Sequence, residues 1–379
     1  MKIAVVTARL PFGSGEAFLL PEIWALIELG HSVRVVPTRT GGKVLHAEAA
    51  RLIERGHVFV PPMVSRLMPA AVPRDLRGVR PKVKVKNALA APVGRWAGEM
   101  SATWRADHIH ACWASTPASV ALIAGQIASV GWSFTMHRWD IHEDNALAAK
   151  LDRACFARAI SVRGAAEVEA RVGRNDVRRL NVGVNLVDGG PRPVSGSRLL
   201  VPASLLPVKG HAVLLEALRN LPDVMVDLVG DGPSRRSLVR DAIRSGIRDR
   251  VHFLGVVPHD VLLRRMRTTP YAAVVLPSLR ISETLQEGIP VALVEAMSAG
   301  IPVISTLSGA VPELLGDDRG LLVEPGNVDA LARAIASVLA DPSSAGERAG
   351  KARLFVAAHH DARRVATQLI DWMHECGGL

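Results

Sequence analysis

Residues 287–306, EGIPVALVEAMSAGIPVIST, hold the start and end of a helix followed by a strand. A helical pattern begins at Val291 and stops at Gly300, and the β-branched run PVIST follows as a strand. Glu287 and Glu295 lie in otherwise apolar surroundings, where a charge is costly unless something pairs with it. The stretch therefore predicts a helix–strand unit that carries two carboxylates near the helix entrance.

The same alternation of apolar strand and helix continues on both sides of this stretch. Runs rich in Val and Ile predict strands at residues 2–8, 31–37, 132–137, 158–162, 198–204, 225–230, 251–255, 271–278 and 302–306. A plausible helix separates each strand from the next. This order is typical of parallel sheets with helices on both faces, so we expect an α/β fold.

A domain boundary is predicted at residues 186–197, LVDGGPRPVSGS, which are polar, rich in Gly and Pro and without periodicity. Each side of this linker is long enough for a doubly wound unit of its own. We predict an N-terminal domain at 1–185, a C-terminal domain at 198–360, and a last helix at 361–379 that packs back on the N-terminal domain.

Composition narrows the class of protein. The 379 residues carry a net charge of +10, which attracts anionic lipid surfaces, polyanions or phosphorylated small molecules. Three separated cysteines indicate no disulfide framework and no metal site. The uncharged run 111–136 divides into a helix and a strand rather than a membrane span. We expect a cytoplasmic protein, and the absence of a nucleic-acid-binding module argues against DNA or RNA as a partner.

The helix start in the first stretch suggests an anion site. Pro290 suits a first helical turn, whose free N–H groups favour a diphosphate. Glu287 before the helix and Glu295 inside it are placed to accept hydrogen bonds from the hydroxyls of a sugar and of a ribose. The alternative is that both carboxylates simply complement the helix dipole.

At this point the chain resembles a known family. EGIPVALVEAMSAGIPVIST is similar to the E-x7-E signature of retaining GT-B glycosyltransferases of family 4, in particular those of bacterial exopolysaccharide and colanic acid biosynthesis. Agreement extends to the segments PSLRISETLQEGIPV, SGAVPELLGDDRGLLVEPGNVDALARAI, HIHACWASTPAS and FTMHRWDIH. The resemblance implies a GT-B fold of two Rossmann-like domains facing a central cleft. It also implies retaining, metal-independent transfer of a hexose from a UDP- or GDP-sugar, without a cofactor.

In the second half, the resemblance implies a donor site. Glu287 would contact the sugar as a catalytic residue, and Glu295 the ribose. Lys209 would neutralise the departing diphosphate, although a KG dipeptide alone equally suits a solvated lysine. Ser204 stands where the family usually has an arginine, which removes one positive charge from the leaving group. The remaining donor-binding positions are Gly288, Pro290, Val291, Ala292 and, beside the nucleotide base, Val256.

In the first half, His137 corresponds to the histidine of the family's T-x-H-x-x-D motif. The resemblance implies that it touches the donor sugar near the reacting centre, whereas a lone histidine in an apolar run is more commonly a core residue. Asp140 would position either His137 or the acceptor. Gly13 lies in the first strand-to-helix loop, whose N–H groups family members direct toward the donor phosphates.

The basic run 74–86 contains Arg74 and the alternating lysines Lys82, Lys84 and Lys86. One interpretation is a solvated face. The other is attraction to an anionic membrane surface or to a diphosphate-linked lipid acceptor, which would place the protein at the inner face of the membrane.

The acceptor implied by the resemblance is a glycan or lipid-linked glycan used in exopolysaccharide or other surface-glycan assembly.

Two alternatives to a glycosyltransferase stay open from the sequence. A catalytically weakened GT-B protein that binds nucleotide sugar as a partner is the main alternative, because of Ser204. An enzyme with a related two-domain fold that catalyses epimerisation or phosphorolysis is the second alternative.

Overall fold

The computed structural model describes residues 1–67, 70–76, 80–187 and 194–377. The chain divides into two compact units. Met1–Gly183 and Ala362–Leu379 form the N-terminal unit, and Val184–Asp361 form the C-terminal unit. The predicted linker begins just after this division, and its residues 188–193 lie outside the described residues.

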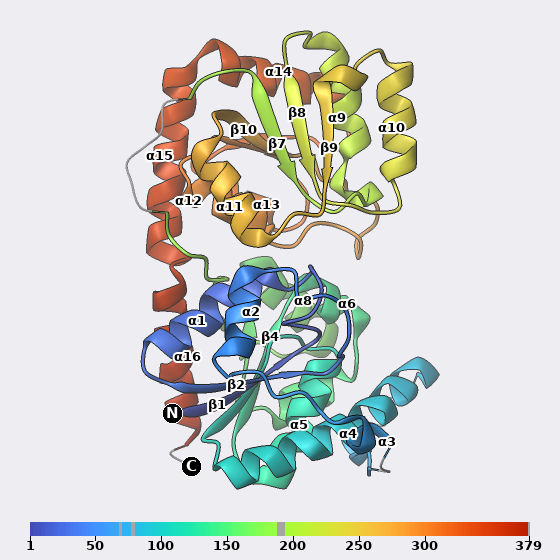
Figure 1. Cartoon of the computed structure of the whole chain (residues 1–379), viewed down its shortest axis with the longest axis vertical. Coiled ribbons are helices and arrows are strands. Elements are labelled where there is room, and N and C mark those ends of the chain that lie inside the picture. The colour runs from blue at the N-terminus through green and yellow to red at the C-terminus, as the bar shows by residue number, and fades with distance from the viewer. Residues whose placement is uncertain (68–69, 77–79, 188–193, 378–379) are drawn as a thin grey trace. The chain divides into compact units, whose positions relative to one another are not determined.

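A parallel sheet of six strands, in the order β2-β1-β3-β4-β5-β6, forms the centre of the N-terminal unit (Figure 1). Its strands are β1 (Lys2–Thr7), β2 (Ser32–Pro37), β3 (His108–Ala111), β4 (Trp132–Met136), β5 (Phe156–Ala159) and β6 (Arg178–Arg179). The chain leaves β1 for β2 on one side and continues through β3 on the other. The strand order therefore reverses between β1 and β3, where the loops at the carboxyl ends diverge.

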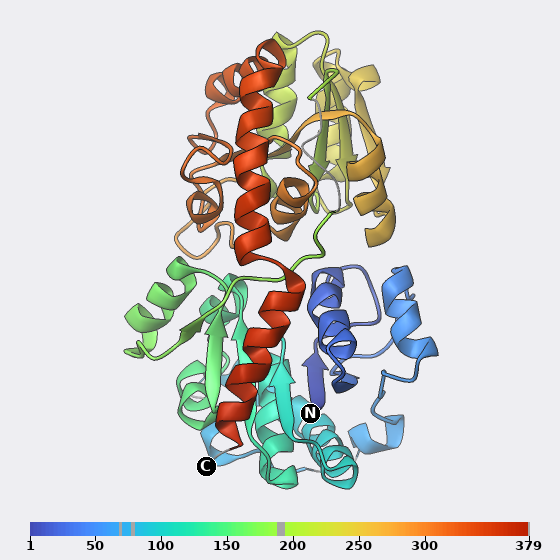
Figure 2. The same cartoon turned by 90° about the vertical axis from the view of Figure 1, so that its left-hand side faces the viewer.

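Helices cover both faces of this sheet. The longer ones are α1 (Leu20–Glu28), α2 (Ala47–Glu54), α4 (Pro81–Trp104), α5 (Thr116–Ala128), α8 (Val162–Val172) and α16 (Ala362–Cys376). Short helices are η1 (Ala17–Leu19), α3 (Met63–Leu67), η2 (Arg74–Leu76), α6 (Arg138–Glu143) and α7 (Leu147–Arg153). In Figure 2 α16, coloured red, lies against the N-terminal unit. Its buried Val365, Leu369 and Met373 join the apolar cluster of α1.

Two glycines bring α4 and α5 close together. A Cβ atom at Gly94 would lie 2.8 Å from the Cβ atom of Ile123, and one at Gly98 would lie 2.7 Å from that of Ile127. Neither helix could keep this spacing with a larger residue at those positions. α4 is therefore fixed against the unit by its glycine-containing face.

The C-terminal unit contains a second parallel sheet, in the order β12-β11-β10-β7-β8-β9. Its strands are β7 (Arg198–Pro202), β8 (Met225–Val229), β9 (Val251–Gly255), β10 (Tyr271–Leu276), β11 (Val303–Thr306) and β12 (Leu321–Val323). This is the order of a doubly wound dinucleotide-binding fold, with its reversal between β7 and β10. The predicted α/β fold with two doubly wound units is confirmed.

Helices also cover both faces of the second sheet. The longer ones are α10 (Arg235–Arg244), α11 (His259–Thr268), α12 (Val291–Ser298), α14 (Val328–Ala340) and α15 (Pro342–His359). Shorter ones are η3 (Pro207–Lys209), α9 (His211–Ala217), η4 (Leu218–Asn220), η5 (Arg248–Arg250) and α13 (Val311–Leu315). Val294, Ala296 and Met297 lie in the apolar core, and α12 is buried from Leu293 to Ser298, so the helix from the opening stretch is held firmly in this unit.

The structure departs from the predicted elements in three ways. The strand expected at 158–162 ends at Ala159, because the side chain of Ser161 caps α8 by accepting a hydrogen bond from the Gly164 N–H. Pro290 precedes α12 as its N-cap instead of lying in the first turn. Strands β3, β6 and β12 were not predicted. The two histidines of β3 interrupt its apolar pattern, and β6 and β12 have only two and three residues.

The uncharged run 111–136 forms α5 and β4, as predicted. Within the described ranges, no helix combines the length and apolar character needed to cross a bilayer.

Candidate functional site

The reversal between β7 and β10 brings two loops of the C-terminal unit together. The backbone N–H of Leu279 donates to the carbonyl of Val208 at 2.7 Å. Gly210 makes this approach possible, because a Cβ atom there would lie 1.8 Å from the carbonyl oxygen of Pro277 and its φ is +69°. Lys209 after β7 and Glu287 after β10 are thereby placed on facing loops.

Lys209 and Glu287 form a close ion pair. The Lys209 Nζ atom donates to both carboxylate oxygens of Glu287, at 2.9 Å for Oε1 and 2.6 Å for Oε2. The Ser278 hydroxyl donates to Oε2 at 2.9 Å. The lysine side chain is 21% exposed and the glutamate 10%, so the ammonium group keeps the readier access to solvent. The arrangement holds one cation and one anion at the edge of the sheet where the carboxyl ends of its strands lie.

The loop after β11 supports Glu287 from behind. Gly309 packs against its backbone so tightly that a Cβ atom would lie 1.7 Å from the Glu287 carbonyl oxygen. The N–H of Ala310 donates to the same carbonyl at 3.4 Å. The glycine of the SGAVPEL segment thus sets the position of the predicted catalytic carboxylate.

The start of α12 carries the other predicted donor-binding positions. Gly288 and Pro290 lead into the helix, and Val291 and Ala292 are its first two residues, all of them partly or fully buried. The backbone N–H groups of a first helical turn have no carbonyl four residues earlier to bond. These N–H groups lie just beyond Glu287 in the chain and give this end of the helix a positive partial charge.

Glu295 lies on the same helix but has a different partner. Its Oε1 atom is 2.5 Å from Nε2 of His259, the first residue of α11. Both side chains are buried, at 7% and 8% exposure. The structure therefore separates the two glutamates of the E-x7-E pattern, one with a lysine and one with a histidine. His259 was missed, because nothing in the sequence links it to a glutamate far along the chain.

Ser204 and Val256 lie on two other loops at this edge. Ser204 is exposed after β7, and the glycine turn after β8 packs behind it, since a Cβ atom at Gly230 would lie 2.1 Å from the Ala203 carbonyl oxygen. Val256 follows β9 and is 48% exposed. No hydrogen bond links either residue to the Lys209 pair within the described part of the chain.

The N-terminal unit holds its candidate residues in a different environment. His137 follows β4 as the N-cap of α6 and is buried between two aromatic rings. Trp113 lies 4.4 Å from it, ring centre to ring centre, and Phe18 lies 5.4 Å away. Burial lowers the pKa of His137 to about 4, so the ring is neutral at physiological pH. Its Nε2 atom has no hydrogen-bond partner among the described residues.

Asp140 braces the loops around His137. Its carboxylate accepts the backbone N–H of His137 at 2.7 Å and that of Ala114 at 2.5 Å. Burial raises the pKa of Asp140 to about 7 and lowers that of nearby Lys150 to about 7. Asp140 is 3% exposed, and it bonds the backbone just after two strands. Of the two roles predicted for it, this geometry fits the positioning of His137.

Gly13 lies in a loop organised by Glu16. The Glu16 carboxylate accepts the N–H groups of Ala8, Arg9 and Leu10, and the Trp113 indole N–H at 2.5 Å. The N–H of Gly13 already donates to the Lys43 carbonyl at 2.9 Å. A contact between this N–H and a phosphate would therefore require that bond to be replaced.

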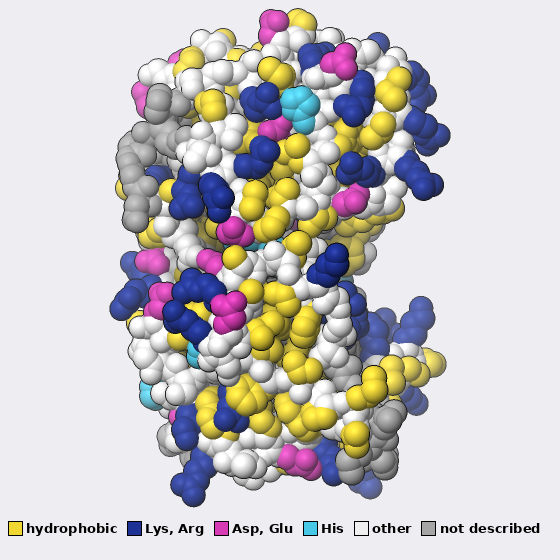
Figure 3. All heavy atoms as spheres, viewed as in Figure 1, with side chains coloured by type: hydrophobic (Ala, Val, Ile, Leu, Met, Phe, Trp, Pro, Cys, Tyr) yellow, Lys and Arg dark blue, Asp and Glu magenta, His cyan; other side chains and the backbone are white. Residues whose placement is uncertain are grey.

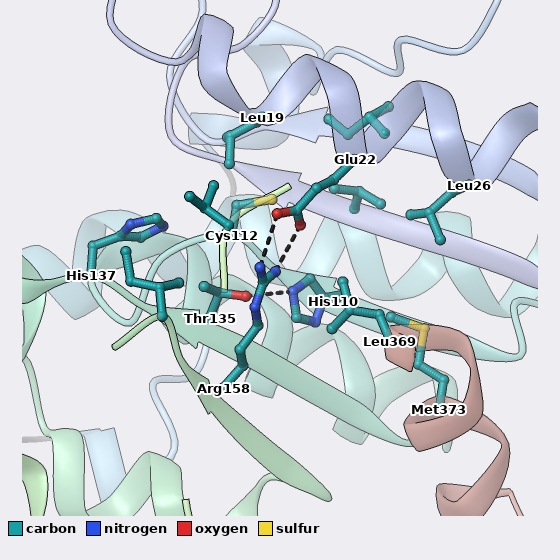
Figure 4. Close-up of a pocket in the computed structure, with 14 residues that line it drawn as sticks. Leu19, Glu22, Leu26, His110, Cys112, Thr135, His137, Arg158, Leu369 and Met373 are labelled. Carbon is teal, nitrogen blue, oxygen red and sulfur yellow. Dashed lines mark hydrogen bonds and ion pairs between the residues drawn. The ribbon is translucent and has the colours of Figure 1, made fainter. Parts of the chain in front are cut away.

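A small cavity lies beneath this site inside the N-terminal unit (Figure 4). Its volume is about 20 Å³, room for about one water molecule. His137 lies at one end, and the buried pair of Arg158 and Glu22 forms a polar wall with Nη1–Oε2 and Nη2–Oε1 distances of 2.7 and 2.9 Å. His110, Cys112 and Thr135 line it from the sheet side, and apolar side chains of α1 and α16 line it from the helix side.

No group of three or more His, Cys, Asp or Glu side chains in the described ranges is arranged to hold a metal ion.

Comparison with solved structures identifies the class of fold. The chain has the two-domain GT-B fold of glycosyltransferases. It is similar to Anabaena HepE in complex with UDP-glucose, at 20% identity, a TM-score of 0.76, and coverage of 99% of this chain and 100% of that one. Sucrose-phosphate synthase from Thermosynechococcus elongatus matches with a TM-score of 0.73 at 19% identity, over 99% of this chain and 98% of that one.

Comparison of sequences then identifies the relatives. Residues 191–354 match the family described as Glycosyl transferases group 1. A GDP-mannose-dependent α-(1-6)-phosphatidylinositol monomannoside mannosyltransferase of Mycolicibacterium smegmatis is 32% identical over 41% of each chain. The amylovoran biosynthesis glycosyltransferase AmsK of Erwinia amylovora is 26% identical over 88% of this chain and 89% of its own. The chain thus spans about two fifths of the length of some curated relatives and nearly the whole of another.

Proposed function

We propose that this chain is a glycosyltransferase that moves a hexose from a nucleotide-diphosphate sugar to an acceptor hydroxyl. The ion pair of Lys209 with Glu287, whose carboxylate also accepts the Ser278 hydroxyl, is the observation at the strand-order reversal that carries the proposal. All three residues lie within the segment that matches group 1 glycosyltransferases. The likeness to an amylovoran biosynthesis enzyme supports an acceptor from exopolysaccharide or other surface-glycan assembly.

Lys209 is the residue to which we assign the leaving group. As the anomeric carbon–oxygen bond breaks, negative charge develops on the diphosphate, and a nearby ammonium group stabilises it. The N–H groups at the start of α12 add partial positive charge on the same edge. Since these groups supply the neutralisation, the proposal requires neither a metal ion nor a cofactor.

Glu287 and Glu295 take the two ends of the donor. Glu287, with its oxygens directed at Lys209, would accept hydrogen bonds from the sugar hydroxyls beside the diphosphate. Glu295 would accept the ribose hydroxyls, with His259 holding its carboxylate in place. Gly288, Val291 and Ala292 contribute backbone contacts, and Val256 lies on the loop assigned to the base. We take the donor to be a UDP- or GDP-sugar, since HepE is solved in complex with UDP-glucose and the mannosyltransferase relative is named as GDP-mannose-dependent.

His137 and Asp140 are the contributions of the N-terminal unit. A neutral imidazole with a free nitrogen suits a hydrogen bond to a sugar hydroxyl, and burial keeps His137 neutral. Asp140 positions it through the backbone. Gly13 would approach the phosphates through its loop, after its bond to Lys43 is exchanged.

We assign the reaction to the retaining class of family 4. The bond between the anomeric carbon and the diphosphate oxygen breaks, and a bond from the acceptor oxygen to that carbon forms on the same face. The proton of the acceptor hydroxyl passes to the released diphosphate. No side chain needs to form a covalent intermediate in this scheme.

Turnover with a panel of UDP-, GDP- and dTDP-sugars tests the proposal. The full chain, supplied with lipid-linked or soluble glycan acceptors, should release nucleoside diphosphate only when the acceptor is present. Proton NMR of the product should show the anomeric configuration of the donor, and EDTA should leave the rate unchanged. An inverted product would overturn the retaining assignment, and EDTA-sensitive turnover would overturn metal independence.

The alternative is a weakened GT-B protein that binds nucleotide sugar without transfer. The observation in its favour is Ser204, exposed at the position where an arginine is usual. A nucleotide sugar that raises the melting temperature without any turnover would support this alternative.

A further inference from the structure

One surface of the N-terminal unit exposes apolar side chains beside lysines. Four side chains of α3 and α4 stand largely in solvent: Met63 is 81% exposed, Val64 70%, Val85 59% and Leu89 74%. Lys82 and Lys84 are exposed on the same segment of α4. Together these six residues are called the amphipathic surface. Figure 3 shows hydrophobic and basic side chains side by side on the projecting end of α4.

The exposed side chains of α4 are oriented by the opposite face of the helix. Val83, Asn87 and Ala90 are buried, whereas Val85 and Leu89, one turn apart, point away from the core. The Asn87 amide donates to the Leu76 carbonyl at 2.6 Å and fixes the rotation of the helix. The apolar exposure is therefore built into the fold.

Ion pairs in the structure distinguish the basic residues of the run 74–86, which look alike in the sequence. Lys86 bonds Glu143, and Arg80 bonds Asp144 with an Nη2–Oδ2 distance of 3.2 Å. Lys82 and Lys84 have no acidic partner within the described ranges. Within the described part of α4, the cations without an acidic partner are thus Lys82 and Lys84, beside the exposed apolar side chains.

We propose that the amphipathic surface binds the headgroup region of an anionic phospholipid bilayer. The lysines would pair with lipid phosphates, while Val85, Leu89 and the α3 side chains enter the boundary with the acyl chains. A protein partner fits less well, because a stable interface buries roughly 800 Å² on each side and the apolar group here is confined to one projecting helix end and a short helix. Recognition rests on charge and not on a pocket, so no single lipid species is required.

This inference is independent of the proposed function, because vesicle binding is measured without donor or acceptor. If vesicle binding is found without any sugar transfer, the proposed function fails and this inference stands. If transfer to a soluble acceptor is found without vesicle binding, only this inference fails.

Flotation of the full chain with lipid vesicles tests whether the amphipathic surface binds an anionic bilayer. Vesicles of phosphatidylglycerol mixed with phosphatidylcholine should carry the protein, and phosphatidylcholine alone should not. Raising the salt from 0.1 to 0.5 M, roughly halving the Debye length, should release it. Lys82→Glu with Lys84→Glu should lower affinity at least about 30-fold, since each lysine near an anionic surface contributes about 1 kcal/mol. Val85→Ser with Leu89→Ser should weaken binding even at low salt.

Matched controls come from the C-terminal unit. Arg236→Glu with Arg240→Glu makes the same change in net charge on the exposed side of α10. Ile243→Ser with Leu354→Ser removes exposed apolar side chains that are 61% and 73% exposed. Both control pairs should bind vesicles like the unaltered chain.

Three results would overturn the inference. Equal binding to neutral vesicles would remove the role of charge. Equal losses in the control pairs would mean that net charge or general hydrophobicity is responsible. A dimer in solution that Leu89→Ser dissociates, with no change in vesicle binding, would make the surface an interface between copies of the chain. Each altered protein should keep its melting temperature, since the changed side chains are exposed.

Discussion

The two candidate sites use their ionisable groups in opposite ways. In the C-terminal unit, Lys209 and Glu287 face each other as an ion pair that solvent still reaches. In the N-terminal unit, His137 is sealed among aromatic rings and loses its charge, and Asp140 and Lys150 are wholly enclosed. One site offers charge to an incoming ligand, and the other offers a neutral hydrogen-bonding group in a rigid apolar frame. The difference predicts that charge-removing changes act on turnover in one unit and that pH acts on stability in the other.

The largest expected effect is that of Lys209→Ala on turnover. Loss of the ammonium group to which we assign the departing diphosphate should lower kcat about 10²- to 10³-fold with a smaller change in KM. Steady-state kinetics with the best donor measure it. Lys351→Ala, which removes an exposed lysine paired with Asp318, is the control and should leave kcat unchanged. Unaltered turnover in Lys209→Ala would break the assignment of charge to the C-terminal site.

The next effect concerns the support of Glu287. Gly309→Ala places a methyl group against the Glu287 carbonyl at a φ of +56°, so the C-terminal unit should lose about 3 kcal/mol or more of stability and most donor binding. Gly246→Ala has a similar φ of +67° with nothing within 4 Å, and should cost only about 1 kcal/mol. Denaturant unfolding gives both values. Equal losses would show that backbone conformation alone, and not contact with Glu287, sets the cost.

The third effect tests the buried histidine through pH. The folded-state pKa of His137 is about 4 and its unfolded value is 6.5, so between these values the unfolded chain binds a proton that the folded chain does not. Stability from this group is present above pH 6.5 and falls with pH until about 4. The stability difference between the unaltered chain and His137→Gln should therefore shrink by about 2 kcal/mol from pH 7 to pH 5.

Exposed His374 provides the control for this measurement. His374→Gln gives the effect of losing an exposed imidazole, with which the pH profile of His137→Gln is compared. A pH-independent difference for His137→Gln would mean that His137 is not desolvated as the structure has it, and the contrast between the two sites would weaken.

The smallest effect comes from restoring a cation. Ser204 is exposed after β7, so Ser204→Arg can add a positive side chain at the edge to which we assign the diphosphate, without disturbing the core. Turnover should rise by up to about tenfold, measured at saturating donor. Ser197→Arg, a serine changed before the same strand at the opposite sheet edge, is the control. A fall in turnover would show that the site is already complete without a second cation.

The sequence predicted the α/β class well because Val and Ile runs mark buried parallel strands locally. It was less accurate where one side chain changes an element, as at Ser161, which caps α8 and ends a predicted strand. Lys209 and Glu287 could be selected from the family motifs that their segments resemble, and the structure adds a glycine close to the backbone at each site.

His259, Glu16 and Trp113 could not be selected in the same way. Their roles depend on contacts between segments far apart in the chain, such as the Glu16 carboxylate on the Trp113 indole. The basic run is a similar case, because only the fold shows which of its charges are already paired. Local patterns therefore predict elements and motif residues, whereas their partners follow only from tertiary structure.

The placement of α16 has a consequence for protein synthesis. Domains emerging from the ribosome generally fold in order, N-terminal first. Here the apolar cluster of α1 is completed only by Val365, Leu369 and Met373, which are translated after the whole C-terminal unit. The nascent N-terminal unit must therefore leave apolar surface uncovered while the rest of the chain is made. A chaperone that shields the exposed face of α1 would have its greatest effect in that interval.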